Sequence, residues 1–322
     1  MRIVVGLPGA ATPEIVDRFV EAGADEFFVG YVPPAWWQRW GVEASPNRRF
    51  RAHSQFLSQE ALAPVVGAAR ARQRPVFLTL NEHALVDLTE ALVDGLVAEA
   101  VEVGVSGVIL ATLELGPRLA ARHPGLQLIA SGEVPIYNRA AARQAARHGF
   151  GRVIFARETS LDDMALMVAE RPPGMTYEAF LLGEWCVYNG ALCLTSHGYG
   201  SRQDFCASHT RRAVLDVGAR TAGLDRPARE DGAPRGCAPD DPAKAYRAAC
   251  ALCSLGRLRD LGVDYVKLPG RSTNALGAVR LVRALIAAPD LSPEAVRAHP
   301  AVAALCDPAN CRSSLGVGVE RP

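Results

Sequence analysis

RVIFARETSLDDMALMVAERPPGMTYEAFLLG, residues 152–183, places a helical pattern between two apolar, strand-like runs. The runs are 152–158 and 177–183, and the helical pattern covers 160–170. Strand-like runs separated by helical patterns of roughly 10–15 residues are typical of units in which two parallel strands are joined by a helix. This stretch therefore predicts a parallel sheet built from repeated strand–helix units.

The rest of the chain repeats the same alternation. Six further strands are expected at 2–7, 26–30, 76–81, 107–112, 126–132 and 264–270. Further helices are expected at 13–23, 58–72, 85–103, 115–123, 138–148, 242–261, 274–287 and 293–305. Eight strands alternating with helices predict an α/β fold of the (β/α)8 TIM-like barrel type, with a doubly wound open sheet as the alternative. We expect the barrel over 1–290 and a C-terminal helix and tail over 291–322.

Two segments interrupt the alternation. Residues 31–56 read as a long loop with three tryptophans and the arginines 48, 49 and 51. Trp36 either contributes to a substrate-binding wall or caps one end of the barrel, and the arginines suit an anionic substrate or an RNA phosphate. The second interruption is a cysteine-rich insertion after the seventh strand, at 184–253, whose Arg-, Asp-, Gly- and Pro-rich part spans 210–241.

Composition limits the function classes. The 322 residues are 49% hydrophobic, which is enough for a large core, and the net charge of +1 makes nucleic acid an unlikely partner. No apolar stretch approaches the ~18 residues of a membrane span. The apolar run in MRIVVGLPGAATPE (1–14) is too short for a secretory signal, so we expect a cytoplasmic protein. Its eight cysteines are then expected to be thiols rather than disulfides.

Three of these cysteines, Cys186, Cys193 and Cys206, follow the strand 177–183 with only loop-like residues between them. A strand fixes one thiolate, and a glycine-rich loop allows others to reach the same centre. Thiolates bind iron–sulfur clusters or zinc. Zinc sites usually contain paired Cys-x2-Cys knuckles, and only Cys250 and Cys253 have that spacing here. The pattern favours an iron–sulfur cluster, with zinc as the alternative.

Polar residues gather at the expected carboxyl ends of the strands, which face the catalytic mouth of such a barrel. They are Asn81, Glu133, Arg157, Glu158, Lys267 and Arg271. Helix caps and rim ion pairs are the structural alternative for each. Functionally, Arg157, Lys267 and Arg271 suit anionic groups, and Glu158 or Glu133 suits proton transfer. The sequence contains neither a G-x-S-x-G elbow nor an H-E-x-x-H motif, so peptidase activity is not expected.

Several segments, in this order and spacing, resemble one family. They are EAGADEFFVG (21–30), NRRFRAHSQFLSQEAL (47–62), VFLTLN (76–81), GRVIFARETSLDDM (151–164), GEWCVYNGALCLTSH (183–197) and LRDLGVDYVKLPGRS (258–272). The family is catalogued as collagenase-like peptidases of unassigned mechanism. Its better-understood members are oxygen-independent hydroxylases, namely the UbiU/UbiV-type pair of ubiquinone biosynthesis and relatives that hydroxylate RNA bases.

The resemblance implies a (β/α)8-like barrel with a [4Fe-4S] cluster on four cysteines. Cys186, Cys193 and Cys206 match the first three ligands, whereas Thr210 occupies the position where many members have the fourth. The remaining candidates are Cys253, which we favour, and Cys250 or Cys237. Cys250 and Cys253 are expected on one face of the helix 242–261. The chain also has Leu-Pro-Gly-Arg at 268–271 where the family typically has Ile-Glu-Gly-Arg. No role follows for Cys306 and Cys311.

The resemblance further implies an oxygen-independent hydroxylase of a small organic substrate, aromatic or anionic, with an organic oxygen donor such as prephenate. Trp36, Asn81, Glu133 and Arg271 are the expected substrate-binding residues, and Arg157, Glu158 and Lys267 the expected catalytic ones. Two alternatives remain open. One is an RNA base hydroxylase of the same family, and the other is a non-catalytic iron–sulfur partner subunit. The protein is expected to form a heterodimer with a second family member or a homo-oligomer.

Overall fold

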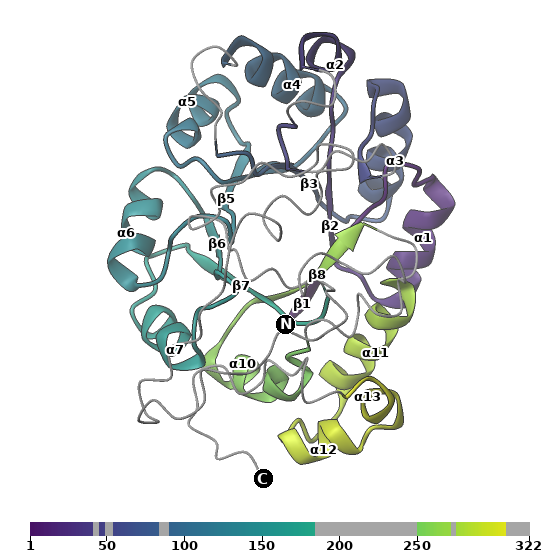
Figure 1. The fold of residues 1–322 in the computed structure, drawn as a ribbon, viewed down its shortest axis with the longest axis vertical. Coiled ribbons are helices and arrows are strands. Elements are labelled where there is room, and N and C mark those ends of the chain that lie inside the picture. The colour runs from purple at the N-terminus through teal and green to yellow at the C-terminus, as the bar shows by residue number, and fades with distance from the viewer. Residues whose placement is uncertain (41–44, 49–53, 84–89, 184–249, 272–274, 307–322) are drawn as a thin grey trace, which may run out of the picture.

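The structure, a computed structural model, describes residues 1–40, 45–48, 54–83, 90–183, 250–271 and 275–306. Its parallel strands form a closed barrel in the order β1-β2-β3-β4-β5-β6-β7-β8 (Figure 1). They are β1 (Arg2–Gly6), β2 (Glu26–Val29), β3 (Val76–Leu80), β4 (Gly107–Leu110), β5 (Gln127–Ala130), β6 (Arg152–Ile154), β7 (Thr176–Phe180) and β8 (Tyr265–Arg271). The predicted TIM-like barrel is confirmed and the open sheet is wrong, because β1 pairs with β8.

Helices surround the barrel on its outside (Figure 1). They are α1 (Pro13–Ala22), α2 (Pro34–Trp40), α3 (Gln59–Ala71), α4 (Glu90–Glu102), α5 (Leu115–Arg122), α6 (Arg139–Arg147), α7 (Leu161–Ala169), α10 (Leu255–Leu261), α11 (Ala275–Ala287), α12 (Pro293–Ala298) and α13 (Pro300–Leu305), with a 3-10 turn η5 (Leu252–Ser254). Local residues set several of their ends. Thr12 precedes Pro13 at the start of α1, and Gly23 ends this helix with a φ of 104°.

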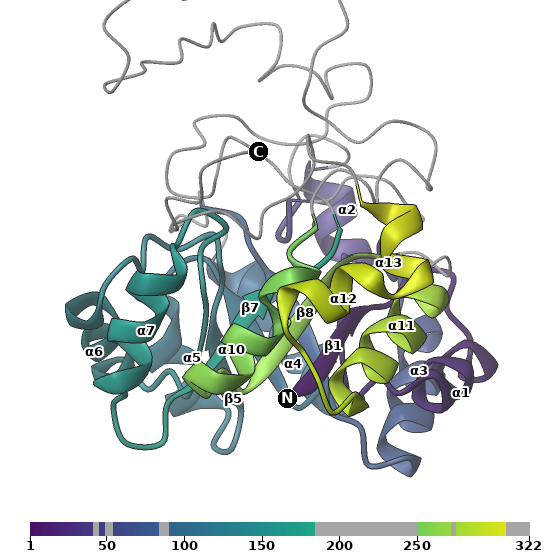
Figure 2. The same ribbon diagram turned by 90° about the horizontal axis from the view of Figure 1, so that it is seen from below.

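Three expected elements differ from the structure. Residues 31–56 were expected as a loop but contain α2, which has Pro34 in its first turn, a position that tolerates proline. The single helix expected at 293–305 is two helices, because Pro300 forces His299 into an extended conformation with ψ at 124°. Within the described part of the helix expected at 242–261, the chain forms the short 3-10 turn η5 and then α10. Figure 2 shows α12 and α13 beside α10 and α11 on the outside of the barrel.

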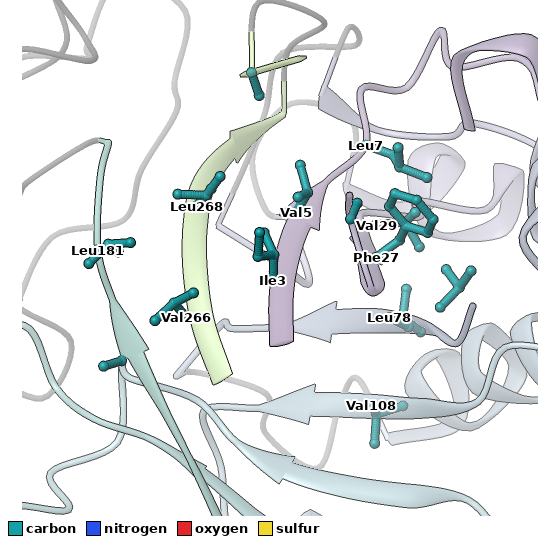
Figure 3. Close-up of a cluster of buried hydrophobic side chains, with 14 of the residues drawn as sticks. Ile3, Val5, Leu7, Phe27, Val29, Leu78, Val108, Leu181, Val266 and Leu268 are labelled. Atoms are coloured by element: carbon teal, nitrogen blue, oxygen red, sulfur yellow. The ribbon is translucent and has the colours of Figure 1, made fainter. Parts of the chain in front are cut away.

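Strand side chains alternate between two separate layers. Ile3, Val5 and Leu268 belong to the outer layer, which packs against the helices (Figure 3). Val4 and the residues in register with it point the other way, into the barrel. The apolar part of this interior consists of Val4, Phe28, Phe77, Ile109, Ile129, Ile154 and Tyr265, with Phe180 packed against them. The interior is therefore a filled core, and a ligand site has to lie at one end of it.

In the part of the chain that the structure describes, we find no helix with the length and apolar character of a membrane span.

Close backbone contact at the carboxyl end of β1 gives the first prediction. The register between β1 and β8 shifts here, so that Gly6 pairs with Arg271. A Cβ atom at Gly6 would lie 2.1 Å from the carbonyl oxygen of Gly270 and 2.6 Å from Cζ of Phe28. Gly6→Ala is therefore expected to lower the free energy of unfolding by about 1–3 kcal/mol, measured by chemical denaturation.

Gly67→Ala is the matched control. Gly67 lies inside α3, and a Cβ atom there would meet nothing within 4 Å. This substitution is expected to raise the free energy of unfolding by about 0.5–1 kcal/mol, because alanine is the better helix former. Equal stability of Gly6→Ala and the wild type would show that the mouth end of β1 is not closely packed.

Candidate functional site at the barrel mouth

Arg157 and Glu133 form an ion pair over the carboxyl ends of β5 and β6. Nη1 of Arg157 donates to Oε1 of Glu133 at 2.9 Å, and the two side chains are 12% and 19% exposed. The guanidinium also lies over the ring of Phe180, with Cζ 4.2 Å from its centroid. Two predicted site residues are thus brought together, and Phe180 at the end of β7 joins them.

The Arg157 guanidinium has one donor that is not used within the described part of the chain. Its Nε atom is buried and has no hydrogen-bond partner among those residues. A guanidinium binds carboxylates and phosphates through a planar fork of two N–H groups. Because Glu133 is bonded to Nη1, the opposite edge, formed by Nε and Nη2, is the one that an anionic oxygen pair fits.

Asn81 directly follows β3 and is half-buried. Its Oδ1 atom is buried and accepts no hydrogen bond from any residue that the structure describes. A buried amide oxygen of this kind is expected to have a donor partner, and a ligand at the mouth can supply one. Asn81 thus remains a candidate for ligand binding.

Glu158 lies beside Tyr137 and is exposed. The Tyr137 hydroxyl donates to Oε1 of Glu158 at 2.5 Å. Burial raises the pKa of Tyr137, and the hydrogen bond to Glu158 and the charge of Glu133 raise it further. Tyr137 therefore stays protonated at neutral pH as a fixed donor to Glu158. This partner of Glu158 was not anticipated from the sequence.

Lys267 lies inside the barrel, deeper than the rim position that the sequence suggested. Its side chain is 7% exposed, and Nζ donates to Oε1 of Glu178 at 2.8 Å. Nζ also lies over the ring of Phe28, 4.0 Å from the centroid. The expectation that a buried charge here is paired is correct, but the partner comes from the neighbouring strand β7.

Lys267 belongs to an interior ion-pair array made of Glu26, Arg152, Glu178 and Lys267. Both terminal nitrogens of Arg152 donate to Glu26, at 2.6 and 3.1 Å. Nη1 of Arg152 also donates to Oε2 of Glu178 at 3.1 Å. The sequence analysis missed Glu26, Arg152 and Glu178. The available signal was a single charge at an inward position within each of three otherwise apolar strands.

Charge and burial oppose each other in this array. Burial alone would raise the pKa of Glu178, but Lys267 and Arg152 outweigh it, and the pKa is lowered. Burial lowers the pKa of Lys267, and the charge of Glu178 opposes that shift only in part. Burial also acts against the charge of Arg152, but the two glutamates raise its pKa above the ordinary value. Glu178 is thus held as a carboxylate between two cations.

The predicted site residues in the tryptophan segment (31–56) and at the end of β8 are not seen at the mouth in the described structure. Trp36 is 1% exposed and lies in the outer hydrophobic core with Tyr31 and Phe56, which favours its structural interpretation. Arg48 is buried, with a φ of 57°, so its charge is not displayed on the surface. Arg271 ends β8, and its side chain lies outside the described residues. The same holds for Arg49 and Arg51.

The described cysteines near the mouth are Cys250 and Cys253. Both are buried, and no disulfide joins them to another described cysteine. The sequence predicted that they share one face of a helix, and the structure differs. Cys250 forms an antiparallel bridge with Leu182, whereas Cys253 lies in η5. The remaining predicted ligands, Cys186, Cys193, Cys206 and Cys237, lie outside the described residues, as does Cys311.

The bridge at Leu182 shows where the cysteine-rich segment leaves and rejoins the barrel. The Ala251 amide donates to the Leu181 carbonyl at 2.8 Å, so the end of the segment lies beside its start. The described residues contain no group of three potential metal ligands. Cys250 and Cys253 are nevertheless soft donors of the kind that an iron–sulfur or zinc centre takes, and they lie where this segment rejoins the barrel.

Comparisons with known proteins give one family and several solved structures. The profile described as Peptidase family U32 matches residues 11–301. No curated protein gives a significant match. A solved structure described as the U32 peptidase Mk0906 is 15% identical with a TM-score of 0.41, covering 56% of this chain and 69% of its own.

Two other solved structures are also similar. A glycerophosphodiester phosphodiesterase from Parabacteroides distasonis is 10% identical with a TM-score of 0.44, covering 88% of this chain and 98% of its own. Tryptophan synthase from M. tuberculosis is 14% identical with a TM-score of 0.38, covering 56% of this chain and 74% of its own.

Proposed function

The chain belongs to peptidase family U32, and from that premise we propose that it is an oxygen-independent hydroxylase of a small organic molecule. The observation that carries the proposal is the pair of buried thiols, Cys250 and Cys253, where the cysteine-rich segment rejoins the barrel mouth. Proteolysis, which the family description suggests, has less support. The chain has neither the serine elbow nor the zinc motif of the common hydrolases.

A [4Fe-4S] cluster would be held by Cys186, Cys193, Cys206 and Cys253, with Cys250 or Cys237 as the alternative fourth ligand. When bound, such a cluster supplies one-electron redox chemistry, which a zinc ion in the same place does not. The residue chemistry agrees with this cofactor, because soft thiolate ligands select iron–sulfur clusters or zinc.

The protein's own side chains suit the remaining tasks. The Nε edge of Arg157 would bind an anionic group of the substrate or of the oxygen donor, and Glu133 holds the guanidinium in place. Asn81 would accept a hydrogen bond from the ligand. Glu158, fixed by Tyr137, would accept or return a proton at the edge of the site. Prephenate, with its two carboxylates, is the donor that the family resemblance suggests.

The direct test is an anaerobic turnover assay. The protein, purified without oxygen, is incubated with prephenate and a panel of small aromatic and anionic compounds, and products are identified by mass spectrometry. A product heavier by one oxygen atom, formed only with the donor, would support the proposal. Turnover only on ribosomal or transfer RNA would establish the RNA-modifying alternative. Turnover only after adding a second family member would identify a partner subunit.

Arg157→Lys gives a sharper prediction for the same assay. Lysine keeps the charge but loses the planar fork, and a hydrogen bond to a charged group contributes roughly 1.5–3 kcal/mol. We therefore expect the KM for the anionic ligand to rise about 10–100-fold.

Arg139→Lys is the matched control for this prediction. Arg139 forms an exposed ion pair with Glu170 on the outside of the barrel and should leave KM unchanged. An unaltered KM in Arg157→Lys would remove Arg157 from the binding site.

A further inference from the structure

Lysine is rare in this protein. Lys244 and Lys267 are its only lysines, and the other 33 of the 35 Lys and Arg residues are arginines. One of the two lysines lies inside the barrel, bonded to Glu178. Arginine stays charged in proteins, whereas a buried lysine readily changes its pKa and can release a proton. In a chain that uses arginine almost everywhere, this position therefore points to a need for a cation that can lose its charge.

Glu178 lies between the two cations of the interior array. One of its oxygens accepts from Nζ of Lys267 at 2.8 Å, and the other accepts from Arg152 at 3.1 Å. Arg152 is held in turn by Glu26 through two further hydrogen bonds. Each of these groups comes from a barrel strand, so their positions are set by regular secondary structure rather than by loops.

Stability alone does not account for such an array. A buried ion pair costs desolvation, and apolar residues of similar volume are often as stabilising. Apolar and aromatic side chains occupy much of the barrel interior here. The array also reaches the floor of the mouth, because Lys267 pairs in register with Phe180, the residue that lies under Arg157. Its place directly beneath the candidate site favours a functional role.

The charged groups that face Lys267 are Glu178 on β7, Arg152 on β6 and Glu26 on β2. Phe28 on β2 covers the ammonium, and β1 contributes the uncharged Val4 in register. Glu178 and Glu26 favour the ammonium, whereas Arg152 and burial disfavour it. Burial thus has the largest effect on the pKa of Lys267 and lowers it, and Glu178 is the strongest opposing influence.

We propose that Glu178 and Arg152 are positioning residues for Lys267, which hold its ammonium against Phe28 beneath the mouth and control when it is charged. The inference rests on the proposed function and on the catalytic role that the family resemblance implies for Lys267. Glu178 is the fixed counter-charge, and Arg152 keeps Glu178 ionised and in place. Lys267 is then the group in the barrel floor that exchanges a proton with a ligand above it.

The scarcity of lysine makes a direct test possible. Protein labelled with 13C at lysine Cε should give two lysine signals, and Lys244→Arg assigns them, because it leaves Lys267 as the only lysine. In a pH titration, Lys267 is expected to titrate below the ordinary lysine pKa. Glu178→Gln is expected to lower the Lys267 midpoint by roughly a further 1–3 units, because an opposite charge within hydrogen-bond distance is lost.

Glu170→Gln makes the same chemical change on the outside of the barrel and should leave the Lys267 midpoint in place. A Lys267 midpoint that does not move in Glu178→Gln would show that Glu178 does not control this charge, and this result would overturn the inference. So would a wild-type Lys267 that titrates at the ordinary lysine value, and this measurement needs no interior variant to fold. The titration requires no turnover, so its outcome is independent of whether the protein proves to be a hydroxylase.

Discussion

Replacing Arg152 with leucine is expected to lower the free energy of unfolding by about 3–5 kcal/mol, because it breaks a buried charge array by removing one partner. Arg152 donates to Glu26 and to Glu178, and both carboxylates are almost completely buried. Without Arg152, Glu26 would retain only the more distant Arg2, at 3.8 Å, among the ion pairs of the described residues. Urea denaturation at neutral pH, followed by circular dichroism, measures the loss.

The pH dependence of the unfolding free energy distinguishes the loss of ion pairs in Arg152→Leu from a simple packing defect. The lowered pKa of Glu178 means that its ionised form contributes stability above the ordinary carboxyl pKa, and this contribution fades as pH falls through the lowered value. In Arg152→Leu, Glu178 keeps Lys267 and Glu26 keeps Arg2, but both carboxylates lose the charge of Arg152. The difference from wild type should therefore shrink on acidification. Arg139→Leu, at an exposed ion pair, should cost less than about 1 kcal/mol. A similarly small loss in Arg152→Leu would contradict the interior array.

Replacing Cys253 with serine is expected to remove most of the iron from protein purified without oxygen. A serine hydroxyl is a poor substitute for a thiolate as a ligand of an iron–sulfur cluster. Cys253 is buried in η5, close to the return of the chain at Leu182. Iron and acid-labile sulfide per chain are the quantities to measure. Cys306→Ser is the control, because Cys306 is exposed beyond the end of α13.

The same assay on Cys250→Ser and Cys237→Ser identifies the fourth ligand. We expect both to keep their iron. Full iron in Cys253→Ser together with loss in one of the others would correct the assignment and leave the cluster in place. Full iron in all three would mean that the fourth ligand is not a cysteine from this part of the chain.

The barrel could be predicted because its signal is local and repeated. RIVVG at β1 and VFLTL at β3 are short apolar runs, each followed by a helical pattern, and this alternation leaves few possible folds. The sequence also predicted the C-terminal ends of several helices, as at Gly23 after α1. These features depend on residues close together in sequence, which is the range that pattern reasoning covers.

The interior array could not be predicted, because it depends on distant pairings. Arg152 and Glu26 are 126 residues apart, and their contact requires the closed barrel. Lys267 was correctly singled out as a buried charge, but its partner is 89 residues away. The sequence shows that such a charge needs a partner, whereas the strand register decides which one it has.

The segment around Cys250 was misread for a related reason. Its sequence, ACALCSLGRLRDL (249–261), favours a helix throughout, but the described helix begins only at Leu255. Hydrogen bonding of Ala251 to Leu181 competes with the helix and holds the chain against the end of β7. Tertiary pairing thus outweighs local propensity where the chain returns to the mouth.

The cofactor at the mouth is the claim on which the proposed chemistry depends. Its most direct test is the iron and acid-labile sulfide content of wild-type protein purified anaerobically, together with its visible absorption spectrum. The account predicts a brown protein with about four iron and four sulfide atoms per chain. A colourless protein that contains stoichiometric zinc would contradict it.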